Sequence, residues 1–155
     1  MKKMRRFDRS MTNEESQELL KRGEYGVLST ADSEGQPFGT PLNYVFYDGS
    51  IYFHSAVEGT KLDNIENNPR VCFTVVGETE LDPKDFSTNY ESVMAFGKVS
   101  IVESGDEYKI LMEFIKKYSP DFMKEGEAYI KAAIDKVLVI KIEVDALSGK
   151  HRVKK

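Results

Sequence analysis

The residues best suited to chemistry lie together between Phe38 and Lys61, in the segment FGTPLNYVFYDGSIYFHSAVEGTK. Two apolar runs meet there at Asp48-Gly49, a pair that favours the positive φ angles of a tight hairpin turn. The second run leads into a polar loop with an imidazole, hydroxyl groups, a glycine and one ammonium group, supplied by His54, Ser55, Gly59, Thr60 and Lys61. Ahead of a short helical pattern, this combination suits an anion such as a phosphate. The alternative is a solvated loop between a strand and a helix.

Single residues of this segment each allow two interpretations. His54 ends an apolar run, so its ring could face a ligand or bond a backbone carbonyl. Lys61 could pair with a phosphate as a point charge, or simply be solvated at the start of a helix. Asn43 lies in an otherwise apolar run, so we expect a buried amide that bonds a neighbouring loop or a heterocycle.

Composition and charge exclude several classes of protein. The 155 residues have the length of a single domain, which we assign to residues 1–155, and the net charge of −4 gives no indication of nucleic-acid binding. The one cysteine, Cys72, lies in an apolar run, where we expect it to pack as a small hydrophobe. One cysteine and two histidines make neither an intramolecular disulfide nor an ordinary metal cluster. There is no apolar run of membrane-spanning length and no signal-peptide core, so we expect a cytoplasmic protein.

The elements that must position these residues follow from periodicity and from turn signals. A first helix is expected from Thr12, which has capping-box spacing with Glu15, to Gly23. Gly97, inside an apolar run, indicates a bulge or a close backbone approach. The expected strands are Tyr25–Ala31, Pro37–Tyr47, Ser50–His54, Arg70–Val76, Tyr90–Val102 and Val137–Ala146. The expected later helices are Lys61–Asn67, Asp106–Tyr118 and Glu125–Ile134. The polar stretch Gly77–Thr88 is expected to be a loop. Strands joined by hairpins favour a mainly β, antiparallel fold, a β-barrel with flanking helices.

The same residues carry a family resemblance. The stretch from Gly23 to Gly77, followed by FSTNYESVMAFGKV, resembles the nitroimidazole-resistance (NimA-like) branch of the pyridoxamine 5′-phosphate oxidase-related flavoproteins. The specific motifs are the hairpin, the H-S-A-x-x-G-x-K loop and the passage K-L-D-N-I-x-x-N-P-R-V, and the similarity covers roughly Met4 to Val102. IEVDALSGK also resembles the C-terminal strand of the family. The resemblance implies an FMN-binding split β-barrel, Greek-key-like, that works as a homodimer with two flavins between the subunits.

The resemblance also implies roles for single residues. It places Thr40, Pro41, Leu42 and Asn43 along the isoalloxazine ring, and Phe53, His54 and Ser55 along the ring edge and the ribityl chain. Thr60 and Lys61 would hold the phosphate. On the next long strand, Ser92 would be a polar flavin contact. In NimA-like proteins the histidine of the H-S-A loop lies near the flavin and is linked to nitroreduction, so His54 is the catalytic candidate. The partner subunit should complete the site, with Lys150 to Arg152 as a candidate contribution.

Departures from the family limit the functional expectation. True pyridoxamine phosphate oxidases carry an arginine-rich R-x-x-L-L-K-like strand and an Arg/His-containing C-terminal signature, where this chain has TPLNYV and SGKHRVKK. Vitamin B6 oxidation is therefore not expected. The first hypothesis is an FMN-dependent oxidoreductase that reduces a small, flat, electron-poor acceptor such as a nitroaromatic, with His54 as proton donor. The alternatives are a flavin carrier, sensor or storage protein without turnover, and a relative that binds haem or a deazaflavin.

Overall fold

The first helix shows how local sequence fixes an element boundary. The computed structural model describes residues 2–103 and 105–153. Helix α1 (Asn13–Arg22) begins after Thr12, whose hydroxyl accepts the amide of Glu15 while the Glu15 carboxylate accepts the amide of Thr12. The predicted capping box is therefore confirmed. The helix ends at Gly23, whose amide donates to the carbonyl of Leu19.

Seven antiparallel strands form one sheet in the order β2-β1-β5-β6-β7-β4-β3. Their bounds are β1 (Gly26–Ala31), β2 (Pro37–Leu42), β3 (Val45–Tyr47), β4 (Ser50–Ala56), β5 (Arg70–Asp82), β6 (Ser87–Ile101) and β7 (Val137–Arg152). The two edge strands, β2 and β3, are consecutive in the chain, so the sheet curls and the chain passes from one edge to the other at Asn43 and Tyr44. The expected mainly β split barrel with flanking helices is confirmed, although Pro37–Tyr47 is two strands rather than one.

The barrel interior is a cluster of buried apolar side chains. Tyr44, Phe53, Phe73, Ile51 and Ile142 are all fully buried in it. Complete burial of such a side chain stabilises the fold by roughly 1.5–3 kcal/mol. Because successive strand residues point to opposite faces, the neighbours of these residues lie on the outer face of the sheet.

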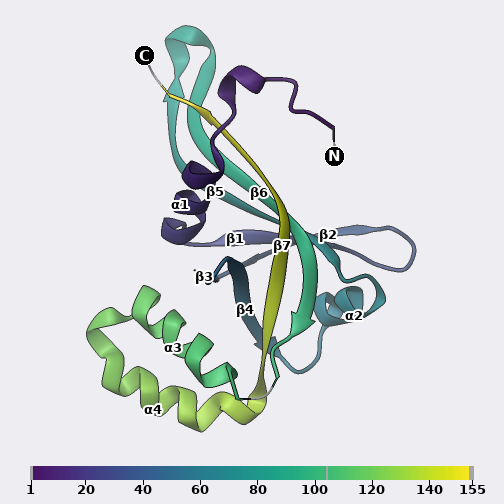
Figure 1. Cartoon of the computed structure of the whole chain (residues 1–155), viewed down its shortest axis with the longest axis vertical. Helices are drawn as coiled ribbons and strands as arrows, with labels where there is room; N and C mark the ends of the chain where they lie inside the picture. Colours follow the sequence, from purple (N-terminus) through teal and green to yellow (C-terminus); the bar gives the residue numbers. More distant parts are fainter. Residues whose placement is uncertain (1, 104, 154–155) are drawn as a thin grey trace.

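Within residues 2–103 and 105–153, three further α-helices lie beside the sheet. Helix α2 (Thr60–Asn67) follows β4, while α3 (Glu107–Tyr118) and α4 (Met123–Ala133) form an insertion between β6 and β7. Figure 1 shows the insertion at one end of the long axis of the molecule. A second apolar cluster, which includes Tyr52, Phe114 and Val139, joins this insertion to the outer face of β4 and β7. Among the described residues, no helix has the length and apolar character that crossing a membrane requires.

A glycine bulge lets two long strands stay paired. The register between β6 and β7 shifts between Phe96 and Gly97. A Cβ atom at Gly97 would overlap the carbonyl oxygen of Glu143, so the close approach requires glycine. The bulge predicted at Gly97 is confirmed.

A long arm extends from the barrel at the end opposite the helical insertion (Figure 1). Strand β5 continues to Asp82, a 3₁₀ turn (Pro83–Asp85) follows, and β6 resumes at Ser87. The loop predicted for Gly77–Thr88 is therefore wrong. Backbone pairs such as Glu80 with Asn89 continue the ladder through this polar stretch. Strand β7 also runs further than predicted, to Arg152, and forms the third strand of the arm.

Candidate functional site

The N-terminus of α2 is open to an anion. Gly59 is its cap residue, with φ of 142°, and offers no side chain to the amides of the first turn. A Cβ atom at Gly59 would meet no described atom within 4 Å, so the space around this residue is free. Thr60 and Lys61 begin the first turn, where they add a hydroxyl and an ammonium group to the positive end of the helix dipole, although the Asp63 carboxylate lies in the same turn. These features fit a phosphate group.

Helix α2 is fixed to the strands that carry the ring-binding candidates. Asn64 is buried, and its side-chain amide donates to the hydroxyl of Thr30 on β1 at 3.1 Å. Thr30 in turn pairs with Phe38 on β2, two residues before Thr40. This contact therefore holds the phosphate candidates of α2 against the strand pair that carries Thr40 to Leu42.

His54 lies on the outer face of β4, under the helical insertion. The ring of Phe114 on α3 meets it edge-to-face, with centroids 4.9 Å apart and an interplanar angle of 70°. Although the imidazole remains partly exposed, this packing removes water and lowers the pKa of His54 below 6.5, and the charge of Lys61 adds a smaller decrease. The neutral form of His54 is therefore favoured over the protonated form. The influence of Lys61 also places these two candidates in one electrostatic environment.

The neighbours of His54 point the other way. Phe53 is 0% exposed within the barrel core, and Ser55 is buried with its hydroxyl donating to the carbonyl of Ala56 at 2.9 Å. The side chains of both residues are occupied by packing and by local hydrogen bonding. Only their backbone groups remain for the ligand contacts that the resemblance implied.

The β2 candidates lie at the edge where the chain crosses to β3. Thr40 and Leu42 are partly buried, whereas Pro41 and Asn43 are exposed. The buried amide expected at Asn43 is therefore wrong, because Asn43 lies in the break between the two edge strands rather than inside a strand. Because the side-chain amide of Asn43 is exposed, it does not require a hydrogen-bond partner within the protein.

Three residues of α3, which the sequence alone did not single out, contact this region. The hydroxyl of Tyr118 accepts the amide of Tyr44 at 3.0 Å, and the Tyr44 carbonyl accepts the ammonium group of Lys117 at 2.9 Å. Burial lowers the pKa of Lys117 to about 8. The third residue is Phe114, which contacts His54. Phe114 and Tyr118 have i,i+4 spacing on an amphipathic helix, which was the available signal.

Ser92 and the basic C-terminal residues are not brought to His54 within one protomer. On β7, His54 pairs with Val139, whereas Ser92 pairs with Lys150. These two β7 positions are eleven residues apart, a separation of roughly 35 Å along an extended strand. Ser92 and Lys150 to Arg152 therefore belong to the arm.

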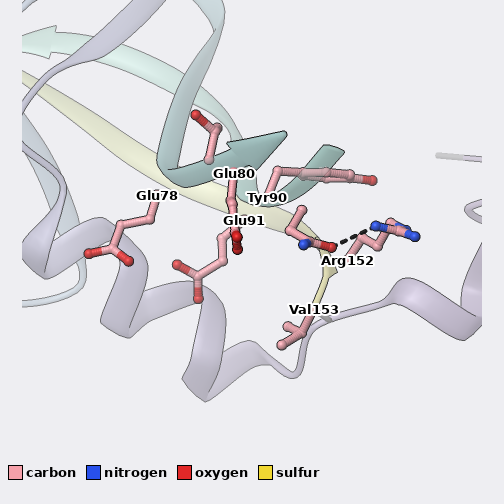
Figure 2. A pocket seen from close by; sticks show the side chains of 8 residues that line it. Glu78, Glu80, Tyr90, Glu91, Arg152 and Val153 are labelled. Carbon is pink, nitrogen blue, oxygen red and sulfur yellow. Dashed lines mark hydrogen bonds between the residues drawn. The ribbon is translucent and has the colours of Figure 1, made fainter. Parts of the chain in front are cut away.

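The arm has a cavity of its own, of about 320 Å³. Figure 2 shows the carboxylates of Glu78, Glu80 and Glu91 on one side and Arg152 on the other. Arg152 donates to Asp82 at 2.9 Å and to the side-chain oxygen of Asn89 at 2.6 Å, the dashed line in Figure 2. The amide nitrogen of Asn89 has no hydrogen-bond partner among the described residues. This acidic lining is unlike the phosphate-type surface around Lys61.

The sequence matches the family described as pyridoxamine 5′-phosphate oxidase over residues 12–151. No curated protein matches the chain.

Solved structures share the fold over nearly the whole chain. A protein from Bacteroides thetaiotaomicron named for resistance to 5-nitroimidazole antibiotics is 26% identical, with a TM-score of 0.66, covering 91% of this chain and 85% of that one. An FAD-binding protein from Mesorhizobium loti is 21% identical, with a TM-score of 0.68 and coverages of 94% and 98%. The flavocytochrome Anf3 from Azotobacter vinelandii is 19% identical, with a TM-score of 0.85 and coverages of 98% and 73%. The chain thus belongs to the pyridoxamine 5′-phosphate oxidase family, and its likeness to the Bacteroides protein fits the NimA-like branch of that family.

Proposed function

We propose that this protein binds FMN and uses it to reduce a small, flat, electron-poor acceptor of the nitroaromatic type. The observation that carries the proposal is the arrangement of His54 and Lys61, with an uncapped helix N-terminus beside the imidazole. The family match and flavin-binding structural neighbours, such as the Mesorhizobium FAD-binding protein, support a flavin as the ligand. The phosphate-type terminus of α2 favours a flavin with a terminal phosphate, which FMN has.

The residues of the chain would divide the work of binding. The Lys61 ammonium group and the backbone amides of Thr60 and Lys61 would hold the phosphate, and the β2 edge from Thr40 to Asn43 would line the ring. Bound flavin supplies reversible storage of two electrons in a flat ring. The protein orients that ring and limits the access of water to it.

His54 would be the proton donor of the reduction. Its lowered pKa leaves most of the side chain neutral at pH 7, with a protonated fraction that grows as the pH falls. We therefore expect turnover to rise on mild acidification, as long as flavin stays bound. His54 is the one imidazole on the outer face of β4.

We propose further that two copies form the working unit. The outer face of β5 and β6 carries exposed apolar side chains, with Val76 54% and Met94 40% exposed and Phe96 on the same face. Exposed apolar side chains gathered on one face of a sheet are typical of a subunit interface. In such a homodimer, the arm of one protomer, with Ser92 and Lys150 to Arg152, would reach the flavin groove of its partner.

The test is a reductive assay combined with cofactor identification. Purified protein should carry FMN or take it up stoichiometrically, and reduced holoprotein should convert a nitroaromatic acceptor. His54→Ala should keep FMN and lose about 10²-fold in turnover, the typical contribution of a general acid. Lys124→Ala, at an exposed site of α4, is the control and should retain its rate. Equal turnover in both variants would remove His54 from the chemistry.

Two alternatives make different predictions in the same experiments. A flavin carrier or sensor would bind FMN without accelerating acceptor reduction above the rate of free reduced flavin. A haem-binding relative, for which the flavocytochrome neighbour is the relevant comparison, would show a Soret band in place of flavin absorption. A deazaflavin would be recognised on release by its chromatographic mobility.

A further inference from the structure

Three aromatic rings connect the two parts of the candidate site through α3. His54 meets Phe114 edge-to-face at 4.9 Å, and Phe114 stacks on Tyr118 with centroids 6.2 Å apart and an interplanar angle of 22°. Contacts of this kind are directional, because the ring edge is positive and the ring face negative. The orientation of the imidazole is therefore coupled to the position of α3.

Helix α3 itself has little freedom to move relative to the sheet. Phe114 is 6% exposed and packs with Tyr52 and Val139 in the outer apolar cluster. At the end of the helix, the Tyr118 hydroxyl lies within hydrogen-bond distance of the carbonyls of Glu24 and Tyr44, at 2.7 and 2.9 Å. Tyr44 directly follows Asn43, so one helix contacts both the proton-donor candidate and the edge expected to line the flavin ring.

Among the residues that the structure describes, one charged group shifts the pKa of His54. From α2, the Lys61 ammonium group acts on the imidazole. On β7, Lys141 pairs with Tyr52, two positions away along β4. The α3 side chains Glu113, Lys116 and Lys117 line a cavity against β3 instead. The aromatic contact is therefore the main local constraint on the imidazole.

We propose that Phe114 is the positioning residue of this site: its ring holds the His54 imidazole in the orientation from which it donates a proton. The inference rests on the proposed function for its catalytic meaning, but the contact can be tested without flavin. It gives the helical insertion a specific task in addition to covering the barrel.

The test is an NMR titration of the imidazole protons in Phe114→Leu, supported by steady-state kinetics. The chain has two histidines, so the imidazole signals that are missing from the spectrum of His54→Ala are those of His54. A smaller, non-aromatic side chain admits water to the ring, so the pKa of His54 should rise towards 6.5. Turnover should fall about tenfold through misorientation while FMN affinity stays within about twofold. Phe122→Leu, at a 61% exposed site of the same insertion, should change neither quantity.

Two further variants separate the effect of the aromatic ring from the effect of side-chain volume. Phe114→Tyr retains the aromatic ring, so His54 in this variant should have the same pKa as in the parent protein. Phe114→Met fills a similar volume without a ring, and it replaces the leucine variant if that one fails to fold. The inference would be overturned if Phe114→Leu or Phe114→Met had the same His54 pKa and the same turnover as the parent protein. If instead His54→Ala has normal turnover while Phe114→Leu still shifts the titration, the proposed function fails and the aromatic contact stands.

Discussion

At the scale of single residues, the phosphate-type site depends on one ammonium group at the start of α2. Lys61 lies in the first turn behind a glycine cap that offers no side-chain acceptor. A charge-assisted hydrogen bond contributes about 1.5–3 kcal/mol, more than a neutral one. The identity of the residue at this position should therefore decide whether the protein distinguishes a phosphorylated flavin from an unphosphorylated one.

We predict that Lys61→Gln weakens FMN binding by about 10- to 100-fold and leaves riboflavin binding nearly unchanged. Fluorescence-quenching titrations with the two flavins measure this difference directly. Lys124→Gln, which removes an exposed lysine of α4, is the matched control and should bind both flavins normally. Equal losses for FMN and riboflavin would mean that Lys61 supports the site in another way than by holding phosphate.

Residue types near the anion loop could be predicted from the sequence, but their orientation could not. The H-S-A-x-x-G-x-K pattern indicated His54 and Lys61, and the charge of Lys61 does contribute to the lowered pKa of His54. The alternation along β4, which buries Phe53 and Ser55 and exposes His54, depends on which face the barrel closes around. Asn43 was expected in a strand interior, and only the crossing from β2 to β3 explains its exposure.

At the scale of elements, α3 is attached where the barrel edge is interrupted. Lys117 donates to the Tyr44 carbonyl, and its ammonium group lies 3.9 Å from the centroid of the Tyr44 ring. Burial nevertheless lowers the pKa of Lys117 to about 8, below the 10.5 of an unfolded chain. Between these two values the unfolded chain binds a proton that the folded protein does not, so stability should rise as the pH increases from 8 to 10.5.

We predict that Lys117→Met reduces this alkaline gain in unfolding free energy by about 1 to 2 kcal/mol. The ring and the carbonyl favour the charged form, so the effect should be smaller than the full shift in pKa would give. Urea denaturation at pH 8 and pH 10.5 measures the difference between variant and parent. Lys124→Met, at an exposed site, controls for the titration of other groups. Parallel pH dependences in all three proteins would show that Lys117 is well solvated.

Element boundaries were predictable where the signal is local and failed where pairing is long-range. The capping box of α1, the Asp48-Gly49 turn and the Gly97 bulge each follow from the preference of one or two residues. The arm was missed because the charged stretch from Glu78 to Asp82 has low strand propensity. The strands of the arm form because the β5–β6 and β6–β7 ladders begin in the barrel and continue into the arm.

At the scale of the whole molecule, the arm and the barrel place the site candidates in two distant groups. In the first group, His54 contacts Phe114 of the helical insertion and Lys61 begins α2, whereas Ser92 and Arg152 of the second group lie on the β6–β7 ladder of the arm. A single protomer cannot bring both to one flavin, because β7 separates them by roughly 35 Å. Two copies packed through the outer face of β5 and β6 would remove this conflict.

We predict a dimer, with twice the 17.6 kDa mass of the chain, that Met94→Lys converts largely to monomer. A lysine at this position would place an unpaired charge within an apolar contact, whose desolvation opposes association. Sedimentation velocity measures the mass, and FMN titration of the same samples should show at least tenfold weaker binding if the partner completes the groove. Ala128→Lys, on the exposed face of α4, should leave both properties unchanged. A parent protein that is monomeric with full FMN occupancy would contradict the shared groove, and the arm candidates would then have no part in flavin binding.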